Sequence, residues 1–178
     1  MLEGIVRESI GKKSVKAFRR DGYLIANIYG KGIENINAAF KENEYIRTVR
    51  NKETVAFDVK VAGKEMQVVV QSYEAHPVTG KLLHVDLMIA QKGLVSSYHL
   101  PVTTIGSAVG LKNKGMVYIA KPRLKVKAKI EDLPAKIVVD VTEMDVGDSK
   151  LIRDIAKVPN VTFLDSDRVS VLSVIKAK

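Results

Sequence analysis

The chain has 178 residues, of which 46% are hydrophobic, so it can bury the core of one domain or of two small ones and is not a disordered tail. Its 29 Lys and Arg residues stand against 20 Asp and Glu residues, and the formal net charge of +9 favours a polyanionic partner. The absence of Cys excludes disulfides, thiolate catalysis and zinc sites with Cys ligands.

The first 22 residues predict a strand followed by a basic helix. Residues 2–9 alternate weakly, as a strand does, and residues 11–22 predict a short helix that ends at Gly22. The apolar stripe of this helix is narrow, so most of its polar residues face outward: Lys12, Lys13, Ser14, Lys16, Arg19 and Arg20. No acid lies between the first and the last of these cations, whereas a solvated helix face normally carries acids at i+4. The pattern therefore favours contact with nucleic-acid phosphates over a merely solvated face.

The middle of the first half predicts a strand, a helix and a hairpin. Residues 23–32 predict a strand that ends in a Gly-Lys-Gly turn, and residues 36–50 predict a second helix. Residues 55–70 alternate on both sides of Ala62-Gly63, which predicts a β-hairpin with one buried face.

A titratable pair lies in the next predicted strand, residues 82–91, which follows a loop at residues 75–81. His84 and Asp86 share one face of that strand, with backbones roughly 6.5 to 7 Å apart. A direct catalytic dyad would need side chains that lean together, whereas this spacing suits contacts to neighbouring positions on a ligand. A metal site built from His76, His84 and Asp86 and a purely structural hydrogen-bonding role remain alternatives.

The second half predicts a different kind of domain. Residues 91–97 are small and polar and mark a boundary, after which nearly every segment is rich in β-branched residues and only residues 151–157 are typical of a short helix. We therefore expect an α+β domain at residues 1–91 and a mostly β domain at residues 92–178.

A second basic segment lies in that β domain. Between Lys121 and Lys129, Lys and Arg alternate with apolar residues, which predicts a basic row on a half-buried strand. The row is either a second nucleic-acid contact or an edge strand protected from aggregation by its lysines. The chain has no Trp and four Phe, which disfavours stacking of single-stranded bases and favours recognition of folded RNA by shape.

Longer motifs resemble one known family. GKKSVKAFRRDGYLIANIYG, followed by HPVTGKLLHVDL, resembles the signature of the bacterial CTC-type ribosomal proteins, large-subunit proteins that bind 5S ribosomal RNA. The stretches LPVTTIGSAVGLKNKG and DLPAKIVVDVTEMDVGDSKLIRDI are similar to the longer members of that family. The resemblance covers nearly the whole chain.

The resemblance implies a non-enzymatic protein of the cytoplasmic ribosome. Its 5S rRNA-binding domain, residues 1–91, would be an antiparallel β-barrel-like structure with two to three helices, and residues 92–178 a C-terminal β domain. The implied partners are 5S rRNA, the large ribosomal subunit and neighbouring ribosomal proteins, with no membrane, metal or cofactor, and a monomer when free. Two alternatives are a stress-induced RNA-binding protein that acts away from the ribosome and a metal-dependent hydrolase.

The motifs and the basic helix together give one set of predicted RNA-binding residues: Arg7, Lys12, Lys13, Ser14, Lys16, Arg19, Arg20, Tyr29, Gln71, His76, Lys81, His84 and Asp86. No catalytic or metal-binding residue is implied. Glu74 departs from the family pattern, in which Gln often precedes the His-Pro loop, and an acid facing phosphate would be repelled. Glu74 is therefore expected either to point away from the RNA or to weaken that contact.

Overall fold

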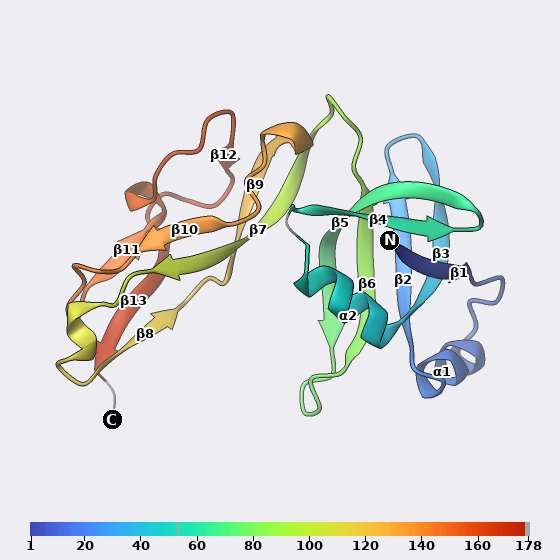
Figure 1. The fold of residues 1–178 in the computed structure, drawn as a ribbon, viewed down its shortest axis with the longest axis horizontal. Helices are drawn as coiled ribbons and strands as arrows, with labels where there is room; N and C mark the ends of the chain where they lie inside the picture. Colours follow the sequence, from blue (N-terminus) through green and yellow to red (C-terminus); the bar gives the residue numbers. More distant parts are fainter. Residues whose placement is uncertain (53, 177–178) are drawn as a thin grey trace. The chain divides into compact units, whose positions relative to one another are not determined.

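The computed structural model describes residues 1–52 and 54–176, which divide into two compact units, Met1–Lys92 and Gly93–Lys178 (Figure 1). Each unit is mostly β-sheet, and both α-helices of the described residues belong to the first. None of the described helices is both long enough and apolar enough to cross a membrane.

Six strands of the first unit close into a barrel in the order β1-β3-β2-β6-β5-β4. The β1/β4 and β2/β6 pairs are parallel, and the other four are antiparallel. Closure leaves no sheet edge, so the backbone hydrogen bonds of the strands are satisfied within the unit. The predicted barrel-like α+β fold is confirmed. Its elements are β1 Leu2–Val6, α1 Lys12–Arg20, β2 Tyr23–Gly30, β3 Ile33–Lys41, α2 Glu42–Arg50, β4 Ala56–Val61, β5 Lys64–Ala75 and β6 Leu82–Ile89.

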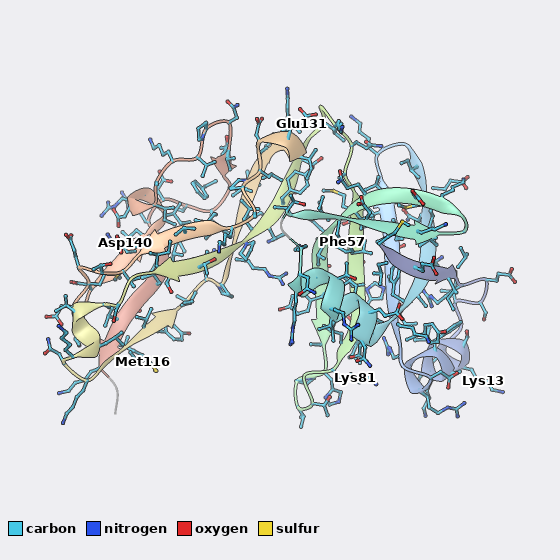
Figure 2. All side chains as sticks on the ribbon, in the orientation of Figure 1. Lys13, Phe57, Lys81, Met116, Glu131 and Asp140 are labelled. Atoms are coloured by element: carbon cyan, nitrogen blue, oxygen red, sulfur yellow. The ribbon has the colours of Figure 1, made fainter. Side chains whose placement is uncertain are left out.

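The barrel core is built from alternate residues of each strand. Phe40, Val59 and Val85 are completely buried, and Phe57 packs with them (Figure 2). Gly4 of β1 lies against the ring of Phe40, where a Cβ atom would overlap ring carbons. Because the inward positions form the core, the residues between them face outward and are available for other contacts.

The helix predicted for residues 36–50 is only half right. α2 begins at Glu42, whereas Ile36–Lys41 belong to β3, which pairs with β2 on one side and β1 on the other. Ala38 and Ala39 favour a helix locally, but both are completely buried between neighbouring strands. Tertiary pairing has overridden local propensity, because a strand here closes the barrel.

Other local predictions are confirmed. α1 ends at Arg20, and Gly22 adopts a positive φ of 81°, as a helix stop requires. The hairpin of β4 and β5 turns at Ala62 and Gly63, whose φ values of 53° and 74° are those of a tight two-residue hairpin turn.

The second unit consists of two small sheets, in the orders β10-β7-β9-β12 and β11-β13-β8. Residues 115–129 are divided at Pro122 between these sheets, since β8 pairs with β13 while β9 pairs with β7. The predicted mostly β character is confirmed. The elements are β7 Val95–Ile105, η1 Val109–Leu111, β8 Gly115–Ile119, β9 Arg123–Lys129, η2 Ile130–Asp132, β10 Ile137–Asp140, β11 Ser149–Leu151, η3 Ile152–Asp154, β12 Thr162–Phe163 and β13 Ser170–Lys176.

Candidate nucleic-acid interface

His84 and Asp86 lie on the outer face of β6, because the intervening Val85 and the following Leu87 are completely buried in the barrel core. The two side chains lean toward one another, and His84 Nδ1 lies 3.7 Å from Asp86 Oδ1. This distance is too long for a hydrogen bond. Asp86 Oδ2 instead accepts a hydrogen bond from the Ser72 hydroxyl of β5. The pair is therefore a fixed polar surface, with Oδ1 of Asp86 still able to accept a further donor.

A row of polar residues crosses four strands at the level of Asp86. Asn27 of β2 is in register with Asp86 on one side and with Asn37 of β3 on the other, and Ser72 lies across from Asp86. The side-chain oxygen of Asn27 is buried and has no hydrogen-bond partner among the described residues. A buried acceptor without a partner is costly in the free protein, so this position is suited to a donor from a bound molecule. We call Asn27, Asn37, Ser72, His84 and Asp86 the barrel face.

Three residues of the barrel face were not among those predicted: Asn27, Asn37 and Ser72. Only Asn27 carries a signal in the sequence, since it is a polar residue in the middle of the otherwise apolar run 23–30. Asn37 lies in a segment whose sequence favoured a helix, and Ser72 lies beyond the clear alternation of its strand. Their contribution depends on strand register, which the sequence does not show.

α1 presents the basic surface that was predicted. Lys12, Lys13 and Lys16 are exposed, and Lys13 is labelled in Figure 2. None of the three forms an ion pair within the described part of the chain. Arg20 is also exposed and lies 3.7 Å from Asp21, a surface pair of small energetic value. Ser14 is half-buried on the same helix. Lysines in the first turn also face the positive end of the helix dipole, which is a mildly unfavourable position.

Arg19 holds α1 against the strand that carries His84 and Asp86. Its Nε and Nη2 atoms donate to the carbonyl oxygen of Leu83, at 3.2 and 2.9 Å. Phe18 packs edge-on against Tyr23, with ring centroids 5.8 Å apart, and secures the end of the helix to β2. Of the predicted residues, Arg19 is thus the one that connects the basic helix to the strand of the barrel face, and it positions the helix.

Arg7 is buried rather than exposed. Its Nε donates to the carbonyl oxygen of Ala38 at 3.2 Å, while Nη1 is buried without a partner in the described residues. Burial, and then the nearby charge of Arg19, lowers the pKa of Arg7. An anion placed beside these two guanidinium groups would relieve both the desolvation and the repulsion.

Tyr29 and Gln71 lie at the rim of the barrel face. Tyr29 is half-buried on β2, in register with Met88, and burial followed by the charge of Asp86 raises the pKa of its hydroxyl. The phenol therefore stays neutral and can donate a hydrogen bond. Gln71 occupies the bulge of β5 opposite β6, and its side-chain oxygen is buried without a partner among the described residues. Both residues thus add polar groups close to Asp86.

His76 and Lys81 have local structural partners in the loop between β5 and β6. Nδ1 of His76 accepts from the amide N–H groups of Val78 and Thr79, at 3.3 and 3.2 Å, so the ring stabilises the turn. Lys81 Nζ lies 3.6 Å from a carboxylate oxygen of Glu42 at the start of α2. Within residues 1–52 and 54–176, no three His, Asp or Glu side chains are close enough to hold a metal ion.

Glu74 does not point away from the barrel face. It is in register with His84, and the side chains of directly opposed residues in an antiparallel pair lie on the same face. The acid is exposed, so it lies where a phosphate group would be repelled and a base amino group attracted.

Comparison with known proteins matches both units. Residues 2–87 match the model of the ribosomal L25p family, and residues 96–178 match the model of the ribosomal protein TL5 C-terminal domain. The large ribosomal subunit protein bL25 of Sulfurimonas denitrificans is 75% identical to the chain, and that of Campylobacter lari is 60% identical. Both alignments cover the whole of each protein.

The chain belongs to the ribosomal L25p family. The match to the TL5 C-terminal domain makes it one of the family's longer members, which confirms the resemblance found in the sequence motifs. L25p proteins are structural proteins of the ribosome and not enzymes, so the absence of a catalytic role follows from family membership.

Proposed function

We propose that this L25p-family protein is a component of the cytoplasmic large ribosomal subunit and binds 5S rRNA through residues 1–91. One observation carries the proposal: Arg19 joins the exposed lysines of α1 to Leu83, the residue next to His84, at 2.9 Å. A phosphate-binding helix and a polar, partly acidic face are thereby held in one rigid arrangement. Phosphate contacts position a nucleic acid, and polar contacts to base edges and hydroxyls select it.

The acidic residue supports recognition of RNA rather than binding of any polyanion. Asp86 repels phosphate, but its oxygens accept from base amino groups or a ribose 2′-hydroxyl. His84 and Tyr29 can donate beside it, and Asn27 offers an acceptor that lacks a partner in the free protein. Such a combination suits the minor groove of a folded RNA, where hydroxyls and base edges are accessible.

A binding titration with 5S rRNA tests the proposal, with transfer RNA as competitor. Asp86→Ala should weaken binding by about 1 to 3 kcal/mol, the value of a good base-edge contact, which is a loss of about 5-fold to 150-fold. The matched control is Asp58→Ala, which removes an exposed carboxylate from β4 of the same barrel and should leave affinity unchanged. Folded Asp86→Ala protein with wild-type affinity would refute the role of Asp86.

The phosphate contribution has a separate measurement. Lys16→Gln should reduce the slope of the logarithm of affinity against the logarithm of salt concentration by about 1. Lys64→Gln, at the exposed β4–β5 turn, should leave that slope unchanged. If the wild-type protein fails to bind 5S rRNA while it still sediments with large subunits, the proposed RNA is wrong and the ribosomal assignment stands.

A further inference from the structure

A second basic surface lies in the C-terminal unit and takes no part in the proposed 5S rRNA site. Along β9, four exposed residues alternate with buried Leu124, Val126 and Ala128. The exposed residues are Arg123, Lys125, Lys127 and Lys129, which we call the β9 face. From Lys125 to Lys129 the row extends about 13 Å, with one cation every second residue.

The structure decides between the two explanations that the sequence left open. β9 is an inner strand, with β7 on one side and β12 on the other. At the centre of the row, the Lys125 carbonyl accepts from the Leu164 amide at 2.9 Å, and Lys127 is in register with Thr162. Lysines that protect a sheet from aggregation lie on an edge strand, so this explanation does not apply to Lys125 and Lys127 at the centre of the β9 face.

The three lysines of this face are not paired with acids. No ion pair involves Lys125, Lys127 or Lys129 in the described residues. The carboxylate of Asp165 pairs with Lys121 at 2.8 Å, and it accepts from the backbone N–H of Lys125 at 3.4 Å. Neighbouring cations of the row repel one another, which an incoming anion would relieve. His99 lies opposite Lys125 on β7. Its pKa is lowered, first by burial and then by the positive charges of Lys125 and Arg123.

The shape of the face narrows the choice of partner. Its neighbours on β7 that share the exposed side are Val95, Ser97, His99 and Pro101, none of which offers the large aromatic ring on which single-stranded bases stack. A peptide strand would need a free edge to add to the sheet, and the centre of β9 has none. A regular row of cations on a flat face instead fits the regular row of anions along a nucleic-acid backbone.

We propose that the β9 face is a second RNA-binding site, which binds the phosphate backbone of a double-helical RNA segment without sequence preference. The site goes beyond the proposed function because it lies in the other unit, and it rests on that function only for the choice of RNA. In this arrangement the barrel face selects the RNA, and the β9 face adds affinity that depends on salt.

The test compares two matched double variants of the full-length protein. Lys125→Gln with Lys127→Gln removes two charges from the β9 face, and Lys112→Gln with Lys114→Gln removes two from the η1–β8 segment of the other sheet, where Asn113 contacts Asp145 at 3.0 Å. The probe is a long, perfectly paired RNA duplex. The first double variant should reduce the salt slope of duplex binding by about 2, and the second should leave it unchanged.

A second measurement locates the RNA. Addition of the duplex should shift the NMR signals of the His99 ring in the wild-type protein, because His99 is in register with Lys125. Equal salt slopes for the two double variants, with His99 signals unmoved, would overturn the proposal. So would weakened binding of a polyglutamate probe with unchanged RNA binding, which would assign the face to an acidic protein. If Asp86→Ala still weakens 5S rRNA binding in that case, the proposed function stands and only the second site fails.

Discussion

The barrel face with α1 and the β9 face are both rich in cations, but they are organised differently. On the barrel, Arg19 fixes the helix that bears the exposed lysines to the strand that carries His84 and Asp86, at 2.9 Å. Two amides, a hydroxyl, a tyrosine and the acid Glu74 lie on neighbouring strands. On β9, the exposed residues of the strand are cations throughout. Cations alone attract any phosphate backbone, whereas a fixed mixture of donors and acceptors distinguishes one RNA from another. The two proposed sites would therefore use the net charge of +9 for two different tasks.

The largest expected effect comes from releasing α1. Arg19→Met removes both hydrogen bonds to Leu83, and it should weaken 5S rRNA binding by about 1.5 to 3 kcal/mol, the value of hydrogen bonds from a charged group. Arg20→Met, which loses only a surface pair with Asp21, should weaken binding less. Binding titrations provide the measurement, with circular dichroism to confirm folding.

A double-mutant cycle shows whether Arg19 acts through position. If Arg19 aligns α1 with the barrel face, the loss caused by Asp86→Ala should be smaller in the Arg19→Met protein than in the wild type. Strictly additive losses would mean that α1 and Asp86 bind RNA independently. The cations of α1 would then not be coupled to the barrel face, and in this respect they would resemble those of the β9 face.

The second prediction concerns the acceptor without a partner. Asn27→Leu removes a buried polar group that has no hydrogen bond in the free protein, so it should raise the free energy of unfolding by about 1 kcal/mol. The same change should weaken binding of 5S rRNA. Urea unfolding and RNA titration of one protein sample give both values. A loss of stability would show that Asn27 is structural.

The third prediction is that one substitution on α1 raises the stability of the free protein and weakens its binding of RNA. Lys13 lies in the first helical turn, where no acid is present. Lys13→Glu should stabilise the free protein by about 0.3 to 1 kcal/mol, because an anion there interacts well with the helix dipole, yet it should weaken RNA binding. Lys13→Gln separates loss of the positive charge from gain of the negative one. Thermal unfolding without RNA is the measurement, and a lower melting temperature for Lys13→Glu would contradict the argument.

The smallest expected effect is a pH dependence in the second unit. The pKa of His99 is lower in the folded chain than its ordinary value of 6.5, so below that value the unfolded chain binds the proton more readily. Stability from this group is therefore complete above pH 6.5 and declines as the pH falls toward the lower, folded pKa. His99→Gln should flatten the fall in melting temperature over this acidic range. Parallel curves for the two proteins would exclude His99 as the cause.

Local sequence signals predicted much of the fold. α1, its stop at Gly22 and the β4–β5 hairpin depend on residues close together in the chain, and all three are confirmed. The helix predicted for residues 36–41 was wrong, because these residues form a strand that is stabilised by partners on β1 and β2. Residues 115–129 likewise divide between two sheets for reasons of packing that no local pattern shows.

By itself the sequence determined the family, the outward face of the basic helix and the shared face of His84 and Asp86, because helical and strand periodicities are local properties. Only the tertiary structure decided which groups meet. Strand register brings Asn27 and Ser72 to Asp86, and barrel closure buries Arg7. Sheet order makes β9 an inner strand, so its lysines are interpreted as a candidate binding face and not as protection of a sheet edge. Register and sheet order are set by burial of distant residues against one another, and that information does not lie within any single segment.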